Sequence, residues 1–187
     1  MSAAQLSGGF VDAPRDGAHA FRAVLNAMSR PGTIVELDAG HGPAPISPAA
    51  ATVLLTLCDP TTPLHLAGSH DNPALRDWIA FHCAAPIVAV EQAVFALGTW
   101  QALQPLQGYS IGTPEYPDRS ATLIVDGHDF DALPSRLTGP GIHDWAQLAL
   151  PDARAFIANH THFPLGWDAI LTSGSRLAAL PRSTEVR

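Results

Sequence analysis

The sequence predicts a single α/β domain spanning residues 1–187, with a mixed β-sheet and helices on its faces. Short β-rich apolar runs alternate along the chain with helical patterns, which is the order expected when helices pack on a sheet. Several predicted helices begin at a capping residue with proline in the first turn, a typical helix start. The chain contains no internal repeat and no linker between two halves, so we expect one domain.

The first predicted helix begins at Asp12, a capping residue with Pro14 in the first turn. Its apolar residues recur at helical spacing: Ala18, Phe21, Leu25 and Met28. The helix is expected to end at Ser29-Arg30-Pro31-Gly32, because proline disfavours helical backbone at the residue before it. The β-rich run 33–37 follows as a short strand.

Two further helices repeat the start of a capping residue followed by proline. Ser47-Pro48 precedes the stretch 49–57, and because this stretch is apolar nearly all round we expect a buried helix. Asn72-Pro73 precedes a helix with one face formed by Leu75, Trp78, Ile79 and His82.

The clearest predicted strand is 121–125, which is rich in β-branched and aliphatic residues. Other strands are expected at 64–66, at 87–90 and in a hairpin whose arms are 168–172 and 176–180. The remaining assignments are an apolar run at 93–97, a helix at 99–106, a long loop at 107–120, a strand at 135–138 and a helix at 151–159.

The surface is expected to carry unusually few charges. Asp, Glu, Lys and Arg make up 14% of the chain, against about 25% in typical soluble domains. Because the centre of a protein interface is poor in charge, this composition favours an interface. A symmetric homodimer is the expected self-assembly, since two-fold dimers are the commonest closed oligomers. The alternative is a compositional bias in which alanine and proline fill the surface.

The sequence contains no lysine, and all ten basic residues are arginines. This excludes a Schiff-base lysine, a P-loop lysine and a lysine general base, each of which needs a primary amine. Recognition of a phosphate would depend on arginines, backbone N–H groups or a bound cation. The net charge of −7 disfavours a nucleic-acid partner, because a phosphate backbone requires a basic face.

Neither an export signal nor a membrane segment is expected. Residues 1–10 lack a basic and apolar leader, and the longest apolar run, 48–58, is shorter than the ~20 residues of a membrane span. Cys58 and Cys83 lie in apolar helical patterns without C-x-x-C spacing, which favours buried free thiols in a reducing compartment. A disulfide between them is the alternative. We therefore expect a cytoplasmic protein with no membrane partner.

Several groups of chemically active residues have simpler structural explanations. Ser69-His70-Asp71 has the residue types of a catalytic triad, but adjacent side chains point in different directions, so a turn and helix cap is favoured. The carboxylate-rich run 126–131 lacks the order of an EF-hand and is interpreted as a polar turn after a strand. His160 and His162, with His143 as a further candidate, lack an acid at recognisable spacing, so no metal site is predicted.

Candidates for phosphate recognition are few. The glycine-rich segment 138–142 matches no phosphate-loop pattern, so a tight turn is favoured over an anion site. Arg30, Arg119 and Arg182 each lie beside loop-forming residues, where a guanidinium could reach a phosphate. Surface solvation or a salt bridge to a partner is the alternative. The residues alone assign no catalytic set.

Six segments form an ordered set that spans nearly the whole chain. They are 21–32 with its SRPG end, LLTLCDPTTP at 54–63, YPDRSATL at 116–123, LTGPGI at 137–142, FPLGWD at 163–168 and ALPRST at 179–184. In this order they resemble the H subunit of the bacterial carbon–phosphorus lyase system. Trp167 stands where members of that family tend to have an aliphatic residue, a difference that concerns packing more than function.

The resemblance implies a role in organophosphonate catabolism. Members of the family act with G, I and L subunits, and with a J subunit in the larger complex. Together they transfer ribose 5-triphosphate from ATP to methylphosphonate, which displaces adenine and forms α-D-ribose 1-methylphosphonate 5-triphosphate. The alternative function is a stand-alone enzyme that binds a phosphate ester or nucleotide through arginines.

The resemblance also implies a three-layer α/β sandwich similar to the large domain of pyridoxal-phosphate-dependent transferases, but without that cofactor. The missing lysine agrees with this, because no other side chain forms the cofactor imine. No cofactor is therefore predicted. The family provides no catalytic residue to carry over, so the isolated chain is expected to be non-catalytic.

Overall fold

A computed structural model describes residues 7–187 and has a six-stranded mixed sheet at its centre. The residues 1–6 of the predicted domain lie outside this description. The strand order is β1 (Val35–Glu36), β8 (Arg176–Leu180), β7 (Asp168–Ser173), β4 (Thr122–Asp126), β3 (Phe95–Gly98), β2 (Leu64–Leu66). Strands β2, β3, β4 and β7 are parallel, whereas β8 is antiparallel to both β7 and β1.

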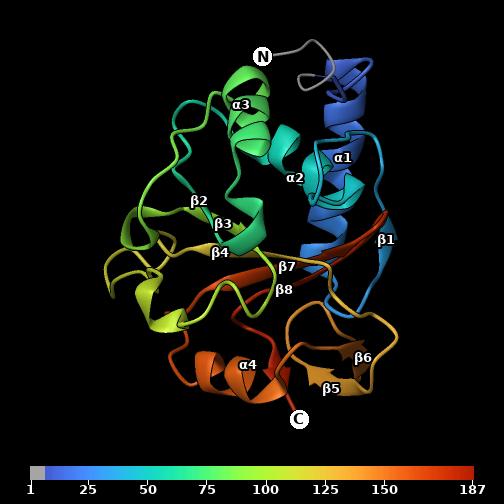
Figure 1. The fold of residues 1–187 in the computed structure, drawn as a ribbon. Helices are drawn as coiled ribbons and strands as arrows, with labels where there is room; N and C mark the ends of the chain where they lie inside the picture. Colours follow the sequence, from blue (N-terminus) through green and yellow to red (C-terminus); the bar gives the residue numbers. More distant parts are fainter. Residues whose placement is uncertain (1–6) are drawn as a thin grey trace.

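Helices and a second, smaller sheet cover the two faces of the central sheet (Figure 1). One face carries α1 (Ala13–Ser29), α2 (Pro48–Leu57) and α3 (Pro73–His82). The other carries α4 (Ala153–His160) and a three-stranded sheet in the order β6 (Ala146–Ala149), β5 (Pro134–Thr138), β9 (Glu185–Val186). Short 3₁₀ helices lie in the connections, at Gly68–His70, Val90–Gln92 and Leu106–Gly108.

The alternation of side chains along the strands divides the interior into two cores. Ile124 of β4 and Ile170 of β7 point into the core under α1–α3. Their neighbours Leu123, Val125 and Leu171 point into the core under α4 and the small sheet. These strands read as continuous apolar runs because both faces of the sheet are buried.

The predicted helix starts are confirmed. Asp12, Ser47 and Asn72 each accept a hydrogen bond from the backbone N–H three residues later, at 3.4, 3.2 and 3.0 Å. Each of the three helices has proline in its first turn, where no intrahelical donor is lost. The strand 64–66 and the hairpin of β7 and β8 are also found at the predicted places.

The buried face of α1 differs from the apolar spacing read in the sequence. Ala20, Val24 and Ala27 are buried, whereas Phe21 is 52% and Leu25 54% exposed. The small side chains let α1 approach β8 and α2 closely, and the bulky ones are turned outward. The helix therefore presents two large apolar side chains, one turn apart, to the surface.

Two predicted elements are wrong. The run 87–90 is not a strand of the sheet, because it makes a single bridge to Leu64 and then enters a 3₁₀ turn, and β3 is formed by 95–98 instead. The helix predicted from Thr99 ends after one turn: Thr99 caps it, but Pro105 offers no N–H to continue it. The short strands β6 and β9 were not predicted.

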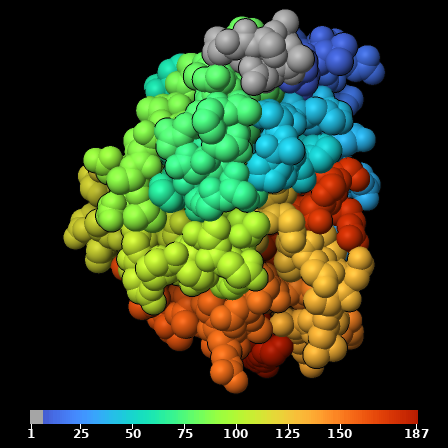
Figure 2. All heavy atoms as spheres, in the orientation of Figure 1, coloured from blue at the N-terminus to red at the C-terminus, as the bar shows by residue number. Residues whose placement is uncertain are grey.

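The space-filling view shows one face of the molecule in the orientation of Figure 1 (Figure 2). The end of the β7–β8 hairpin, coloured red, reaches the surface beside the blue-to-cyan N-terminal segments, where β8 pairs with β1. Within residues 7–187, no helix is both long and apolar enough to cross a lipid bilayer. Cys58 and Cys83 are buried free thiols, as the sequence predicts.

Candidate functional site

A cavity of about 300 Å³ opens at the carboxyl ends of β3 and β4. Open α/β sheets bind ligands at this edge, because the loops after parallel strands meet there. The lining residues come from the turns after the two strands and from the start of the α4 segment: Thr99, Trp100, Gln101, Val125, Asp126, Gly127, His128, Asp129, Ala132, Leu150 and Pro151.

Asp126, the last residue of β4, is the most deeply buried carboxylate of this cavity, at 2% exposure. Its Oδ1 accepts hydrogen bonds from Thr172 Oγ1 at 2.9 Å and from the backbone N–H of Gly127 at 3.0 Å. Its Oδ2 accepts from the backbone N–H of Ser47 at 2.9 Å and from His70 Nε2 at 3.0 Å. All of its acceptor positions are therefore used within the protein.

The carboxyl group of Asp126 is ionised at neutral pH. Burial raises its pKa, but the hydrogen bonds from His70, Ser47 and Thr172 outweigh burial and hold the pKa below its ordinary value. Since an ionised carboxylate only accepts, His70 carries a proton on Nε2. The other ring nitrogen of His70, Nδ1, is buried and has no hydrogen-bond partner in the part of the chain that the structure describes.

His128 lies two residues further along the same turn and is also buried. Burial lowers its pKa, so the ring is neutral at physiological pH. Its Nε2 lies 3.0 Å from the carbonyl oxygen of Ala149, to which it donates, and this leaves Nδ1 as an acceptor. The imidazole ring meets Phe130 edge to face.

One wall of the cavity is aromatic. Trp100 stacks on Phe156 of α4 with 5.7 Å between ring centroids, and Trp167 packs against both rings edge to face. Because Phe156 and Trp167 are buried, they hold Trp100 in a fixed orientation at the cavity. Of the three rings, Trp100 lines the cavity, and its two aromatic neighbours fix it there.

This geometry fits binding better than nucleophilic catalysis. The lining contains no cysteine, serine or arginine, and the hydroxyl of Thr99 is used to cap the following turn. Among residues 7–187, no three side chains of the metal-ligating types gather in one place. His160 contacts the carbonyl of Arg182 through Nδ1, His143 pairs with Asp144, and His162 lies exposed.

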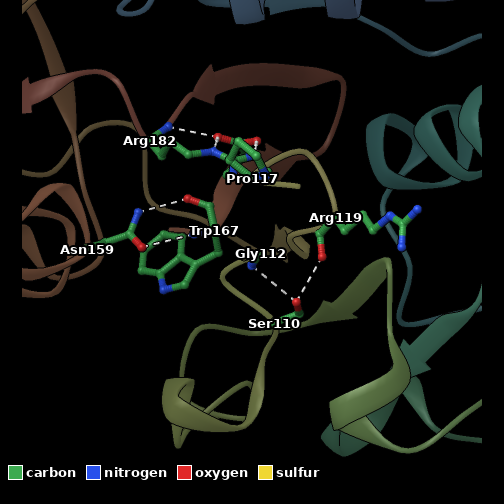
Figure 3. A network of polar contacts seen from close by, with 8 residues as sticks. Ser110, Gly112, Pro117, Arg119, Asn159, Trp167 and Arg182 are labelled. Atoms are coloured by element: carbon green, nitrogen blue, oxygen red, sulfur yellow. Dashed lines mark hydrogen bonds and ion pairs between the residues drawn. The ribbon is translucent and has the colours of Figure 1, made fainter. Parts of the chain in front are cut away.

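Arg182, one of the three candidate phosphate ligands, lies at the opposite edge of the sheet from the cavity. It forms a two-pronged ion pair with Asp168, at 3.1 Å from Nε and 2.6 Å from Nη2, and donates to the carbonyl of Pro117. Figure 3 shows this contact, with the Asn159–Trp167 hydrogen bonds beside it. Each of the three guanidinium nitrogens thus donates one hydrogen bond near the start of β7.

Arg119 and Arg30 do not join Arg182 in one site. The guanidinium of Arg119 lies 4.0 Å over the exposed Tyr116 ring and points away from the network of Arg182 in Figure 3. Arg30 is an exposed residue at the end of α1. The structure does not bring the three guanidinium groups together as a phosphate site.

The two polar motifs are turns, as the sequence predicts. Ser69-His70-Asp71 forms a 3₁₀ turn before the cap of α3, and 126–131 is a turn after β4. The segment 138–142 is a tight turn packed on the end of α1. A Cβ at Gly141, whose φ is +81°, would lie 2.0 Å from the carbonyl oxygen of Ser29, so only glycine fits there.

The pair of His70 and Asp126 was not predicted as a unit, although both residues were considered in their own turns. Each residue follows or ends a parallel strand, His70 after β2 and Asp126 in β4, and Thr172 lies in β7. What the two residues share in the sequence is a position at or after the carboxyl end of a strand. This shared position predicts that they meet only when the order of the strands in the sheet is known.

Comparisons with known proteins agree on one family. A family model described as "Bacterial phosphonate metabolism protein (PhnH)" matches residues 8–187. The alpha-D-ribose 1-methylphosphonate 5-triphosphate synthase subunit PhnH of Rhizobium meliloti (strain 1021) is 35% identical over 96% of this chain and 94% of its own length. The putative C-P lyase subunit protein HtxG of Stutzerimonas stutzeri is 32% identical over 89% of this chain and 84% of its own length. The chain belongs to the PhnH family of bacterial phosphonate metabolism proteins.

Proposed function

We propose that this protein is a subunit of the complex that makes α-D-ribose 1-methylphosphonate 5-triphosphate in organophosphonate catabolism. The observation that carries the proposal is the 35% identity to a named subunit of that synthase, which extends over 94% of the relative's length. Relatedness over nearly the whole of both chains favours the same place in the same assembly. The reaction transfers ribose 5-triphosphate from ATP to methylphosphonate.

The site geometry supports a subunit that depends on partners rather than a complete enzyme. A triphosphate and a phosphonate require cationic groups for binding and for stabilising charge in the transition state. The described cavity has no cation in its lining, and Arg182 is neutralised by Asp168. The partners, for which we propose the G, I, J and L subunits, would supply the cations.

The rival function, a stand-alone enzyme that binds phosphate through arginines, has weaker support. Four of the ten arginine side chains form ion pairs among the described residues, and they include the candidate ligand Arg182: Arg76 with Asp71, Arg176 with Asp131, Arg182 with Asp168 and Arg187 with Glu185. An arginine held by a carboxylate must break that pair before it can bind a phosphate.

The experiment compares the purified chain alone with the reconstituted complex, supplied with ATP and methylphosphonate. We expect adenine release in the complex, loss of that release when this chain is omitted, and none from the chain alone. Turnover by the isolated chain would contradict the proposed dependence on partners. A complex equally active without this chain would contradict its role as a required subunit.

We further propose that the chain folds as one domain, shares its layers with the large domain of pyridoxal-phosphate-dependent transferases, and holds no covalent pyridoxal phosphate. The single central sheet that serves both cores supports the first two points, and the absence of lysine supports the third. An absorbance band of an internal aldimine, fixed to the chain by borohydride, would contradict the third point.

We propose a homodimer as the state of the isolated chain. Its support is the low charge content and the exposed apolar pair of Phe21 and Leu25, one helical turn apart on α1. Sedimentation equilibrium at micromolar concentration tests this. A monomer would contradict the proposal and leave only the other subunits to cover this face. If the chain is a dimer, Phe21→Glu is expected to weaken it and Phe163→Glu, the control, is not. That result would place the interface on α1.

A further inference from the structure

We propose that the cavity after β3 and β4 binds an uncharged nucleoside, with the base packed on Trp100, and discriminates against the phosphorylated forms of that nucleoside. The proposal stands on the cavity's own residues and does not depend on the proposed function. It assigns to this chain a ligand site of its own, separate from any site that handles phosphate groups.

The charge of the lining excludes an anionic ligand. The charged side chains among the lining residues are those of Asp126 and Asp129, both acidic. His128 adds no positive charge because burial lowers its pKa. The guanidinium that acts electrostatically on His128 is that of Arg176, and it is held by both carboxylate oxygens of Asp131 at 3.0 and 3.2 Å. A phosphate in the cavity would therefore face carboxylates without a counter-ion.

Beside the indole N–H of Trp100 and the Gln101 amide, which can donate, the lining offers two acceptors to a ligand that donates. Asp126 is saturated by its four donors and serves to hold the turn. His128 keeps an acceptor at Nδ1, because its Nε2–H is directed at Ala149. Asp129 is exposed and uses Oδ1 for the backbone N–H of Asp131, which leaves Oδ2 as a second acceptor. Ribose hydroxyls and the exocyclic amine of a base are donors of the required kind.

The aromatic wall and the volume select a flat ring. Trp100 is half-buried and is fixed by its stack on Phe156, so it presents its surface without losing side-chain freedom on binding. Stacking of a base on an aromatic side chain strengthens binding and does not depend on the identity of the base. A volume of about 300 Å³ lies at the lower end of small-molecule sites, which suits a nucleoside better than a larger cofactor.

The test is calorimetric titration of the full-length chain with adenosine, adenosine monophosphate and ATP as probes. We expect adenosine to bind and ATP to bind at least about tenfold more weakly, with the monophosphate between them, because each added phosphate brings negative charge toward Asp126 and Asp129. Absence of adenosine binding up to about 1 mM, or ATP binding as tight as adenosine, would overturn the proposal.

Matched variants locate the binding. Trp100→Leu is expected to weaken adenosine binding about tenfold, whereas Trp145→Leu, which removes an exposed tryptophan outside the lining, leaves the affinity unchanged. Ala132→Arg adds a cation at the exposed rim without removing a contact, and it is expected to strengthen ATP binding while adenosine binding stays the same. If Trp100→Leu does not fold, an unchanged preference for adenosine in Ala132→Arg still refutes the site.

Discussion

His70 and Asp126 are 56 residues apart in the sequence, yet Nε2 of the histidine lies 3.0 Å from Oδ2 of the aspartate in a pair that is almost fully buried. The same carboxylate holds the backbone N–H of Ser47 at the start of α2 and the hydroxyl of Thr172 in β7. One side chain thus ties together the turn after β2, the end of β4, the neighbouring strand β7 and the start of a helix.

Replacement of Asp126 by alanine is expected to lower the free energy of unfolding by about 3–5 kcal/mol, because it leaves several buried donors without an acceptor. Urea denaturation followed by circular dichroism measures this change. Asp71→Ala is the control: it removes an exposed partner of Arg76 and should change the stability little. Equal losses of unfolding free energy in the two variants would show that the buried hydrogen bonds of Asp126 add no more stability than an exposed ion pair.

His128 is expected to make the protein less stable in mild acid. Burial lowers its pKa in the folded state, so below about pH 6.5 the unfolded chain takes up a proton that the folded protein does not bind. The free energy of unfolding therefore falls as the pH drops below that value, by up to about 1.4 kcal/mol per pH unit, until the lowered folded-state pKa is passed.

His128→Gln keeps an N–H near the position of Nε2 but does not titrate, so the acid slope should become shallower in this variant. The measurement is the free energy of unfolding between pH 7 and pH 5. An identical slope in the wild-type chain and in the variant would refute the role of His128. Asp126 causes a second loss of stability at lower pH. Its lowered pKa means that the ionised carboxylate stabilises the fold, and this stabilisation disappears as the carboxylate is protonated.

Arg182→Lys is expected to destabilise the fold by about 1–3 kcal/mol, although the charge is kept. An ammonium group cannot bond both oxygens of Asp168 and the carbonyl of Pro117 with the geometry of the guanidinium fork. Thermal unfolding compares this variant with Arg187→Lys, whose exposed pair with Glu185 should matter little. A loss of phosphate affinity without any loss of stability would instead support the phosphate-binding role predicted from the sequence.

The two cysteines are expected to be nearly inert toward a thiol reagent in the folded protein. Burial raises the pKa of the Cys83 thiol to about 12, and burial is also the main cause that raises the pKa of Cys58. At pH 8 the thiolate fraction is then about a thousandfold or more below that of a free cysteine. Both thiols should react at once after denaturation, and rapid reaction of either one in the native state would contradict the burial.

The parts of the fold that the sequence predicts well are those fixed by local chemistry. A capping side chain followed by proline locates the start of α1, α2 and α3 whatever the rest of the molecule does. The Ser-Gly-Ser turn locates the β7–β8 hairpin in the same way. In these places a few neighbouring residues determine the outcome.

The errors occur where tertiary contacts decide. Both 87–90 and 95–98 are short apolar runs, and only the pairing of 95–98 with β2 and β4 makes that run a strand of the sheet. Phe21 is as apolar as Val24, but the close approach of α1 to β8 leaves room only for the smaller side chain. The His70–Asp126 pair was missed for the same reason, because its distance in space depends on the order of the strands.

The position of β8 has a consequence for how this protein can be made by a ribosome. Residues 176–180 lie between β1, near the start of the chain, and β7, and within residues 7–187 β1 pairs with no other strand. A nascent chain that has emerged only as far as β4 still lacks both arms of this hairpin. On that side of β4, Ile124 and Val125 would therefore have no neighbouring strand to pair with. Folding must therefore be completed late, after most of the polypeptide has been synthesised, and the unfinished sheet edge is the surface that a chaperone would have to shield.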